Sequence, residues 1–301
     1  MKRALLSGML AMAIACPALA QPASPAPGTD DTGKADETII VPGNKTTSEA
    51  THDFLKNYAA PAPLLGKLTR WDRRNPVCAH AGGFPSGYDR FTVNRIRDIA
   101  AMVGAPLSRK PDCKTNLAII VTRDPQGLMS EVRANHPDLL GYYQSNAQAD
   151  RLATMRFPVQ VLYETVTIDP NGHIVRDTRF GDSPAGTGDR LRDGLTSAFW
   201  NVTIVVDAAK VDQFHLQMGA LTDYLAMVAL SQTDNFTPCQ ELPSIASLMA
   251  ADCATGGLAT AITSVDIAYL KGLYSNDPER TPIIQRGGIA RDVEKSLSGG
   301  K

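Results

Sequence analysis

The side chains best suited to metal or acid–base chemistry in this sequence are its histidines. They are widely separated along the chain: His52, His80, His136, His173 and His215. A zinc site built on one helix needs a second His, Cys or carboxylate at ligand spacing on the same face. No second histidine or cysteine stands at such a spacing from any of these histidines, so the sequence predicts no metal site and no cofactor.

Serine nucleophiles and paired carboxylates do not indicate an enzyme either. The chain has no Gly-x-Ser-x-Gly elbow, and the Gly-rich stretch 181–194 lacks the lysine of a phosphate-binding loop. Catalysis by two carboxylates depends on their separation and burial, which a sequence does not supply. The remaining catalytic candidates are Asp223 and His215, which could act in a cleft beside the buried helix that we expect over 212–230.

The first twenty residues have the pattern of a cleavable bacterial signal peptide. Lys2-Arg3 is followed by an almost wholly apolar run over 4–15, and Ala18-Leu19-Ala20 forms a small-x-small cleavage site. The run is shorter than the roughly 20 residues of a transmembrane helix, and no later segment comes close. We expect a periplasmic or secreted protein, cleaved near Ala20, with no transmembrane segment in the mature chain.

Cys16 leaves a second possibility open, because a lipoprotein signal also ends at a cysteine. We rank it lower, since Ala13-Ile14-Ala15 lacks the leucine that usually stands three residues before a lipidated cysteine, and Pro17 follows. Residues 21–48 are rich in Pro, Ala, Gly, Thr and Asp and would form a flexible leader, because they have too little apolar surface to offset the entropy of ordering.

Four cysteines remain after the expected cleavage, namely Cys78, Cys113, Cys239 and Cys253. An even number in an oxidising compartment predicts two disulfides, for which three pairings are possible. The pairs Cys78–Cys113 and Cys239–Cys253 are favoured, because each closes a local loop. Zinc binding is disfavoured, since no two of these cysteines have the close spacing of zinc ligands.

The composition is that of an ordinary globular protein, with 43% hydrophobic residues and a formal net charge of −1. A nucleic acid or an anionic membrane as partner would call for a clustered excess of Lys and Arg. The overall balance shows no such excess. We therefore expect no nucleic-acid partner, and an unknown envelope protein or a small ligand instead.

Hydrophobic periodicity predicts a single α+β domain over 49–298, in which a small mixed sheet packs on helices. The expected elements of its sheet-rich part, 65–207, are strands at 77–80, 116–122, 159–168, 173–178 and 198–207 and helices at 88–103 and 125–134. Asn171-Gly172 is typical of a hairpin turn. The expected elements of the helical part, 208–298, are helices at 212–230, 243–250, 263–274 and 286–297.

The order of these elements resembles the core of zinc metallopeptidases of the zincin type. There a strand, a long helix and a second strand precede an edge hairpin, a further strand and a buried helix bearing His-Glu-x-x-His. The segments that carry the resemblance are 77–80, 88–103, 116–122, 198–206, 212–230 and 263–274. The resemblance implies a zincin-like fold in which helix 212–230 stands in the place of the zinc-binding helix.

The chain departs from that family at the residues that would hold zinc. In place of the motif it has Thr222-Asp223-Tyr224-Leu225-Ala226. Thr222 and Ala226 stand in the ligand positions and offer a hydroxyl and a methyl group, neither of which replaces an imidazole. Asp223 stands in the place of the general base, which does not restore catalysis without the metal.

A closer resemblance is to uncharacterised exported proteins of Gram-negative bacteria, which implies no activity. It rests on 71–74 (Trp-x-Arg-Arg), Cys78, 113–117 and 223–230. Our leading hypothesis is an exported, non-catalytic binding or envelope protein on a metallopeptidase-like scaffold.

Two alternatives to that hypothesis stay open. One is a periplasmic hydrolase of envelope peptides or glycans, in which Asp223→Asn or His215→Ala abolishes turnover with little change in melting temperature. The other is a lipid-tethered structural component of the envelope.

Overall fold

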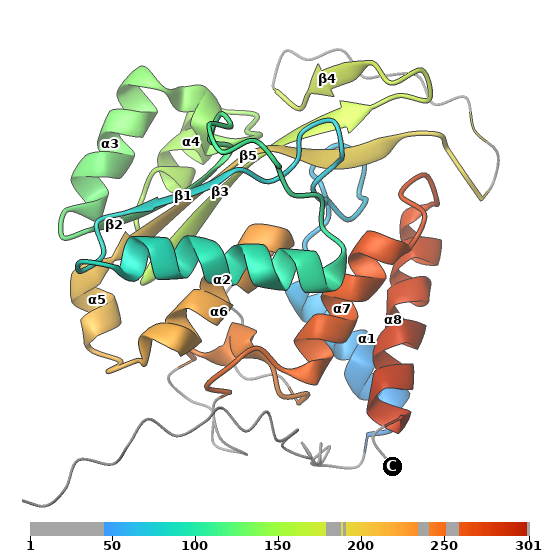
Figure 1. Cartoon of the computed structure of the whole chain (residues 1–301). Helices are drawn as coiled ribbons and strands as arrows, with labels where there is room; N and C mark the ends of the chain where they lie inside the picture. Colours follow the sequence, from blue (N-terminus) through green and yellow to red (C-terminus); the bar gives the residue numbers. More distant parts are fainter. Residues whose placement is uncertain (1–44, 179–187, 189–190, 234–240, 251–258, 300–301) are drawn as a thin grey trace, which may run out of the picture. The chain divides into compact units, whose positions relative to one another are not determined.

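The computed structural model describes residues 45–178, 188, 191–233, 241–250 and 259–299 (Figure 1). All of them belong to one compact unit, Glu37–Lys301. The expected signal peptide, Cys16 and most of the expected leader lie outside the described residues. Cys239 and Cys253 lie outside them as well.

Helices and strands alternate in the first part of this unit, and helices follow in the second. The helices are α1 (Thr47–Tyr58), α2 (Tyr88–Val103), α3 (Pro125–Asn135), α4 (Asn146–Leu152), α5 (Ala208–Asp212), α6 (Met218–Leu230), α7 (Ser264–Ser275) and α8 (Pro282–Ser298), with 3₁₀ turns η1 (Pro137–Leu140) and η2 (Ile245–Ser247). The strands are β1 (Ala79–Gly82), β2 (Leu117–Thr122), β3 (Val159–Ile168), β4 (Ile174–Arg176) and β5 (Thr196–Asp207).

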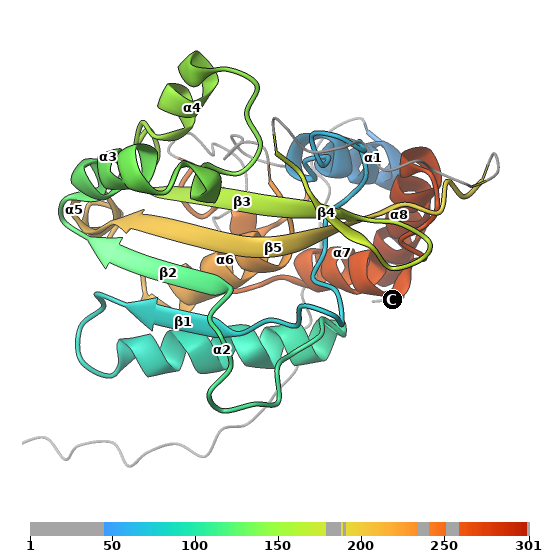
Figure 2. The same ribbon diagram turned by 90° about the horizontal axis from the view of Figure 1, so that it is seen from above.

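The strands form one mixed sheet in the order β1-β2-β5-β3-β4 (Figure 2). β1, β2 and β5 are parallel, whereas β3 runs antiparallel to β5 and pairs with β4 in a hairpin. α2 makes the crossover from β1 to β2, because parallel neighbours cannot be joined by a tight turn. The predicted α+β class with a small mixed sheet and a helical C-terminal half is confirmed.

The sheet separates two hydrophobic cores. α2, α6 and α7 lie on one face, and α3 and α4 lie on the other (Figure 1). The larger core is centred on α6, in which every residue from Ala220 to Leu230 is buried. This explains why its sequence is apolar almost all round, as expected for a helix surrounded by protein. The smaller core joins α3 to the sheet through Met129, Leu162 and Val205.

The first and last described helices lie side by side (Figures 1 and 2). Thr46 and Glu49 form a capping box at the start of α1. At its other end, the Arg286 guanidinium from α8 donates to the backbone oxygens of Leu55 at 3.3 Å and Ala59 at 3.1 Å. A cation at this position satisfies the free carbonyls of a helix C-terminus. α8 therefore completes α1.

The expected helix over 212–230 is helical only from Met218, as α6; residues 213–217 are not helical, and Asp212 is the last residue of the separate short helix α5. His215 has a φ of +49°. This left-handed conformation is rare for residues other than glycine and cannot continue a right-handed helix. The regular apolar spacing from Phe214 to Val228 crosses the break, so periodicity did not reveal it.

Two smaller differences follow from local capping. The expected helix at 243–250 is only the turn η2, where the Ser244 side chain accepts the N–H of Ala246. α8 begins at Pro282 rather than 286, since proline is favoured in the first turn of a helix. η1 and α4 were not expected.

The buried carboxyl of Asp177 makes the stability of the β3–β4 hairpin dependent on pH. Burial raises the pKa of Asp177, against the opposing effect of hydroxyl bonds from Thr165 at 2.6 Å and Thr167 at 2.8 Å. The folded state thus keeps this proton to higher pH than the unfolded chain does. The associated stability is complete below the unfolded pKa, about 4, and is lost as pH rises through the folded pKa.

Asp177→Asn removes this titration, so the variant should gain stability relative to the wild type as pH rises from about 4 to 7. Urea unfolding of both proteins across that range measures the difference in free energy of unfolding. A difference that stays constant with pH would contradict the prediction.

Candidate functional site

A large cavity lies near the amino ends of β1 and β2. It is formed by the chain leading into β1, the loop after α2 and the end of α7, and has a volume of about 1060 Å³. Five cationic side chains line it, namely Arg70, Arg73, Arg109, Lys110 and Lys114. In a chain with a net charge of −1, this concentration of positive charge marks a place where anions gather.

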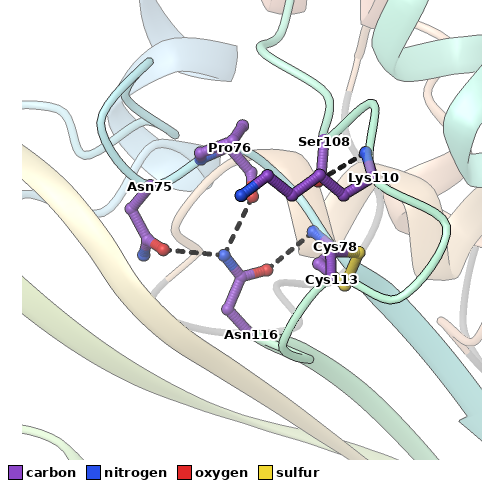
Figure 3. Close-up of a disulfide and its surroundings, with 7 residues drawn as sticks. All are labelled: Asn75, Pro76, Cys78, Ser108, Lys110, Cys113 and Asn116. Carbon is purple, nitrogen blue, oxygen red and sulfur yellow. Dashed lines mark hydrogen bonds between the residues drawn. A yellow bond between two sulfur atoms is a disulfide. The ribbon is translucent and has the colours of Figure 1, made fainter.

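A disulfide between Cys78 and Cys113 joins the two chain segments that carry these cations (Figure 3). It is one of the two pairs favoured from the sequence. Beside it, the Asn116 side-chain amide donates to Asn75 Oδ1 at 2.9 Å and to Pro76 O at 3.0 Å and accepts from Cys78 N at 2.8 Å. The loop after α2 is therefore held firmly against the lead-in to β1.

Backbone contacts place Arg70 with similar firmness. Phe199 N donates to Arg70 O at 3.0 Å, which pairs the chain at Arg70 in parallel with the start of β5. The next residue, Trp71, is fully buried against Phe199, and its indole N–H donates to Ala229 O in α6 at 2.9 Å. Arg70 thus projects from a rigid part of the core.

The Arg70 guanidinium is buried but only partly hydrogen-bonded. The residue is 6% exposed, and Nη1 donates to Asn276 O at the end of α7 at 2.7 Å. Nε and Nη2 are buried and have no hydrogen-bond partner among the described residues. Burial lowers the pKa of Arg70 to about 10, so the group is still charged at neutral pH. A buried charge that lacks partners is costly, and an anion would relieve that cost.

In Arg95 of the same protein, the guanidinium edge formed by Nε and Nη2 binds a carboxylate. Its Nε and Nη2 donate to the two carboxylate oxygens of Asp223 at 2.6 and 2.9 Å. The same pair of nitrogens is the one without a partner in Arg70. Two parallel N–H groups match the geometry of a carboxylate or phosphate. Arg70 therefore keeps, unbound by any described residue, the pair of donors that binds an oxyanion in Arg95.

The other four cations of the cavity are exposed, and none forms an ion pair with a described residue. Asp72 is the acidic residue in the lining, and its carboxylate already pairs with Arg74 at 3.1 Å. The positive charge of the cavity is therefore largely uncompensated by the described part of the chain.

No protein-family model, curated protein or solved structure matches this chain. Across the described ranges, no helix is both long and apolar enough to cross a membrane, and no three His, Cys, Asp or Glu side chains are grouped to hold a metal ion.

His215 and Asp223, the catalytic candidates from the sequence, are not brought to one cavity. His215 is exposed and lines a second cavity of about 730 Å³, at the carboxyl ends of β1, β2 and β5. Asp223 does not line it. Its buried carboxylate pairs with Arg95 and also accepts the N–H of Ile262 at 2.9 Å. These contacts describe a structural ion pair between α2 and α6.

We expect Asp223→Asn to destabilise the protein, in contrast to the small change in melting temperature that a catalytic role predicts. The amide cannot accept both Arg95 donors, and loss of a charged hydrogen bond costs about 1.5–3 kcal/mol. Urea unfolding gives the free energy. Asp212→Asn is the control, since Asp212 is exposed and forms no ion pair with a described residue. Equal stability of both variants and the wild type would contradict the structural role.

The sequence did not reveal the Arg70 cavity, although a signal was present. Basic residues flank both favoured cysteines, as 70–74 before Cys78 and 109–114 around Cys113. Bringing the cysteines together also brings these segments together. The net charge of the whole chain hides such a local excess.

Proposed function

We propose that this protein is an exported, non-catalytic binding protein that takes an anionic ligand on Arg70. The observation that carries the proposal is the buried guanidinium with Nε and Nη2 unpartnered, at a cavity lined by four further cations. A bidentate oxyanion would satisfy both nitrogens and neutralise a buried charge. Export is supported by the signal-peptide pattern and by the Cys78–Cys113 disulfide, since disulfides persist in oxidising compartments.

A metallopeptidase-like scaffold for this function is also part of the proposal. It is supported by the strand order, by the antiparallel β3 next to the parallel strands, and by the buried α6 beneath the sheet (Figure 1). These features agree with the element order that the sequence suggested. Fold-level likeness carries no activity, so the binding site rests on Arg70 alone.

The residues in the zinc-ligand positions of such a scaffold do not fit a metal. Thr222 is buried with its hydroxyl 3.4 Å from that of Thr92, and Ala226 has no ligating atom. Asp223 is occupied by Arg95. This supports a non-catalytic role, and stoichiometric metal in the carefully purified protein would contradict it.

Anion binding can be measured by isothermal titration calorimetry of hexanoate and hexyl phosphate into the protein at low ionic strength. We expect saturable binding of at least one probe and a rise in melting temperature with its concentration, because a ligand of the native state stabilises it. Arg70→Lys keeps the charge but loses the paired N–H groups, and should weaken binding about tenfold, or about 1.4 kcal/mol. Arg70→Met should abolish it.

The matched control is Arg151→Met, which removes an exposed arginine of α4 outside the cavity and should bind like the wild type. Circular dichroism and melting temperature confirm that each variant is folded. If neither probe binds the folded wild type, or if Arg70→Lys and Arg70→Met bind as tightly as Arg151→Met, the proposal is wrong and Arg70 only caps α7.

A further inference from the structure

The volume of the Arg70 cavity is far larger than one oxyanion requires. At about 1060 Å³ it reaches the upper end of the range, roughly 300–1,000 Å³, of pockets that enclose whole organic ligands. A single carboxylate on Arg70 would leave most of this space to water. The ligand therefore has a body as well as an anionic group.

The cations of the cavity lie in two different environments. Arg70 is buried, whereas Arg109, Lys110 and Lys114 are exposed on one short loop that the disulfide holds. One oxyanion bound bidentately to Arg70 neutralises one of these charges and leaves Arg109, Lys110 and Lys114 without an ion pair among the described residues. A second anionic group on the same ligand would supply it.

The remaining lining is suited to an uncharged body. It includes the apolar side chains of Pro76, Pro106, Leu107 and Pro278 and the ring of Tyr274. Pockets for organic ligands commonly combine such apolar walls with a few charged groups that fix orientation.

We infer that the ligand is an organic molecule with at least two anionic groups, one seated on Arg70 and another on the disulfide-held loop. This inference rests on the proposed function and adds the class of ligand. Carboxylate and phosphate share the chemistry that the guanidinium recognises, so the test includes both.

The test compares each single anion with a matched dianion in isothermal titration calorimetry at low ionic strength. The carboxylate pair is hexanoate and adipate, and the phosphate pair is hexyl phosphate and hexanediol bisphosphate. In the wild type, at least one dianion should bind about tenfold tighter or more than its monoanionic match. The pair with the larger ratio identifies which oxyanion the site prefers.

A loop variant and a charge-matched control locate the second anionic group. The loop variant is Arg109→Gln/Lys110→Gln/Lys114→Gln, and it should reduce the dianion-to-monoanion ratio to within about twofold, because the exposed contacts of the second group are lost. The control is Lys56→Gln/Arg151→Gln/Lys271→Gln, which changes the net charge equally at exposed positions outside the cavity and should keep the ratio.

The outcomes separate this inference from the proposed function. If monoanions bind in an Arg70-dependent way but no dianion binds more tightly, the inference is overturned and the proposed function stands. The inference is also overturned if the loop variant keeps the wild-type ratio of dianion to monoanion affinity. If no probe binds, both the inference and the proposed function are wrong.

Discussion

Removing the Cys78–Cys113 disulfide is expected to lower the free energy of unfolding by about 4 kcal/mol. The bond closes a loop with a sequence separation of 35, and the chain-entropy model assigns about 4 kcal/mol to a loop of this length. The variant is Cys78→Ala/Cys113→Ala, and urea unfolding measures the loss. The substitution is preferable to a reductant, because it changes these two cysteines alone.

The single variant Cys113→Ala separates the covalent link from side-chain packing. Cys113 is only half-buried, so shortening its side chain removes little packing, yet the variant also breaks the bond. We expect it to lose nearly as much stability as the double variant. A loss below about 1 kcal/mol for Cys113→Ala would show that the cross-link contributes little.

Lys67→Met is expected to cost about 3–5 kcal/mol, because it removes a fully buried charge from a cage of oxygen atoms. The ammonium donates to Asp193 Oδ1 and Leu195 O, with longer contacts to Pro278 O at 3.4 Å and Glu279 O at 3.3 Å. Methionine keeps the length of the side chain but donates no hydrogen bond. The oxygens are then left without their donor, and the loop before β5 loses its attachment to the segment after α7.

Lys56→Met is the matched control for this prediction. Lys56 is exposed in the last turn of α1, so the same substitution there should change the free energy of unfolding by less than about 0.5 kcal/mol. The loss of free energy of unfolding in Asp193→Asn should lie between those of Lys67→Met and Lys56→Met, since Lys67 would keep its three carbonyl acceptors. Equal stability of the Lys67 and Lys56 variants would show that the cage adds nothing to folding.

Much of the fold could be predicted because its signals are local. α2 spans Tyr88–Val103, the range that periodicity predicted, and β3 spans Val159–Ile168 in the same way. The break at His215 could not be predicted, since its left-handed backbone depends on how α6 turns to enter the core. The spacing of apolar residues indicates which residues are buried, but it does not indicate where a helix is interrupted.

The candidate site could not be predicted for a different physical reason. Arg70 and Lys114 are far apart in sequence, and the importance of Arg70 lies in two nitrogens that lack a partner in three dimensions. Asp223 was noticed because of its place in a helix, but its partner Arg95 is 128 residues away. Residue type and spacing do not show whether a charge is already paired.

The contact between α1 and α8 also determines when the domain can finish assembling. Arg286 and Leu55 are 231 residues apart, so the C-terminal end of α1 is capped only after α8, the last described helix, has been synthesised. Long-range closure of this kind slows folding, since the entropy of a large loop must be lost before the contact forms. A chain delivered N-terminus first therefore stays incomplete until its final helix is available, and a ribosome stalled before Pro282 would leave α1 undocked and open to proteases.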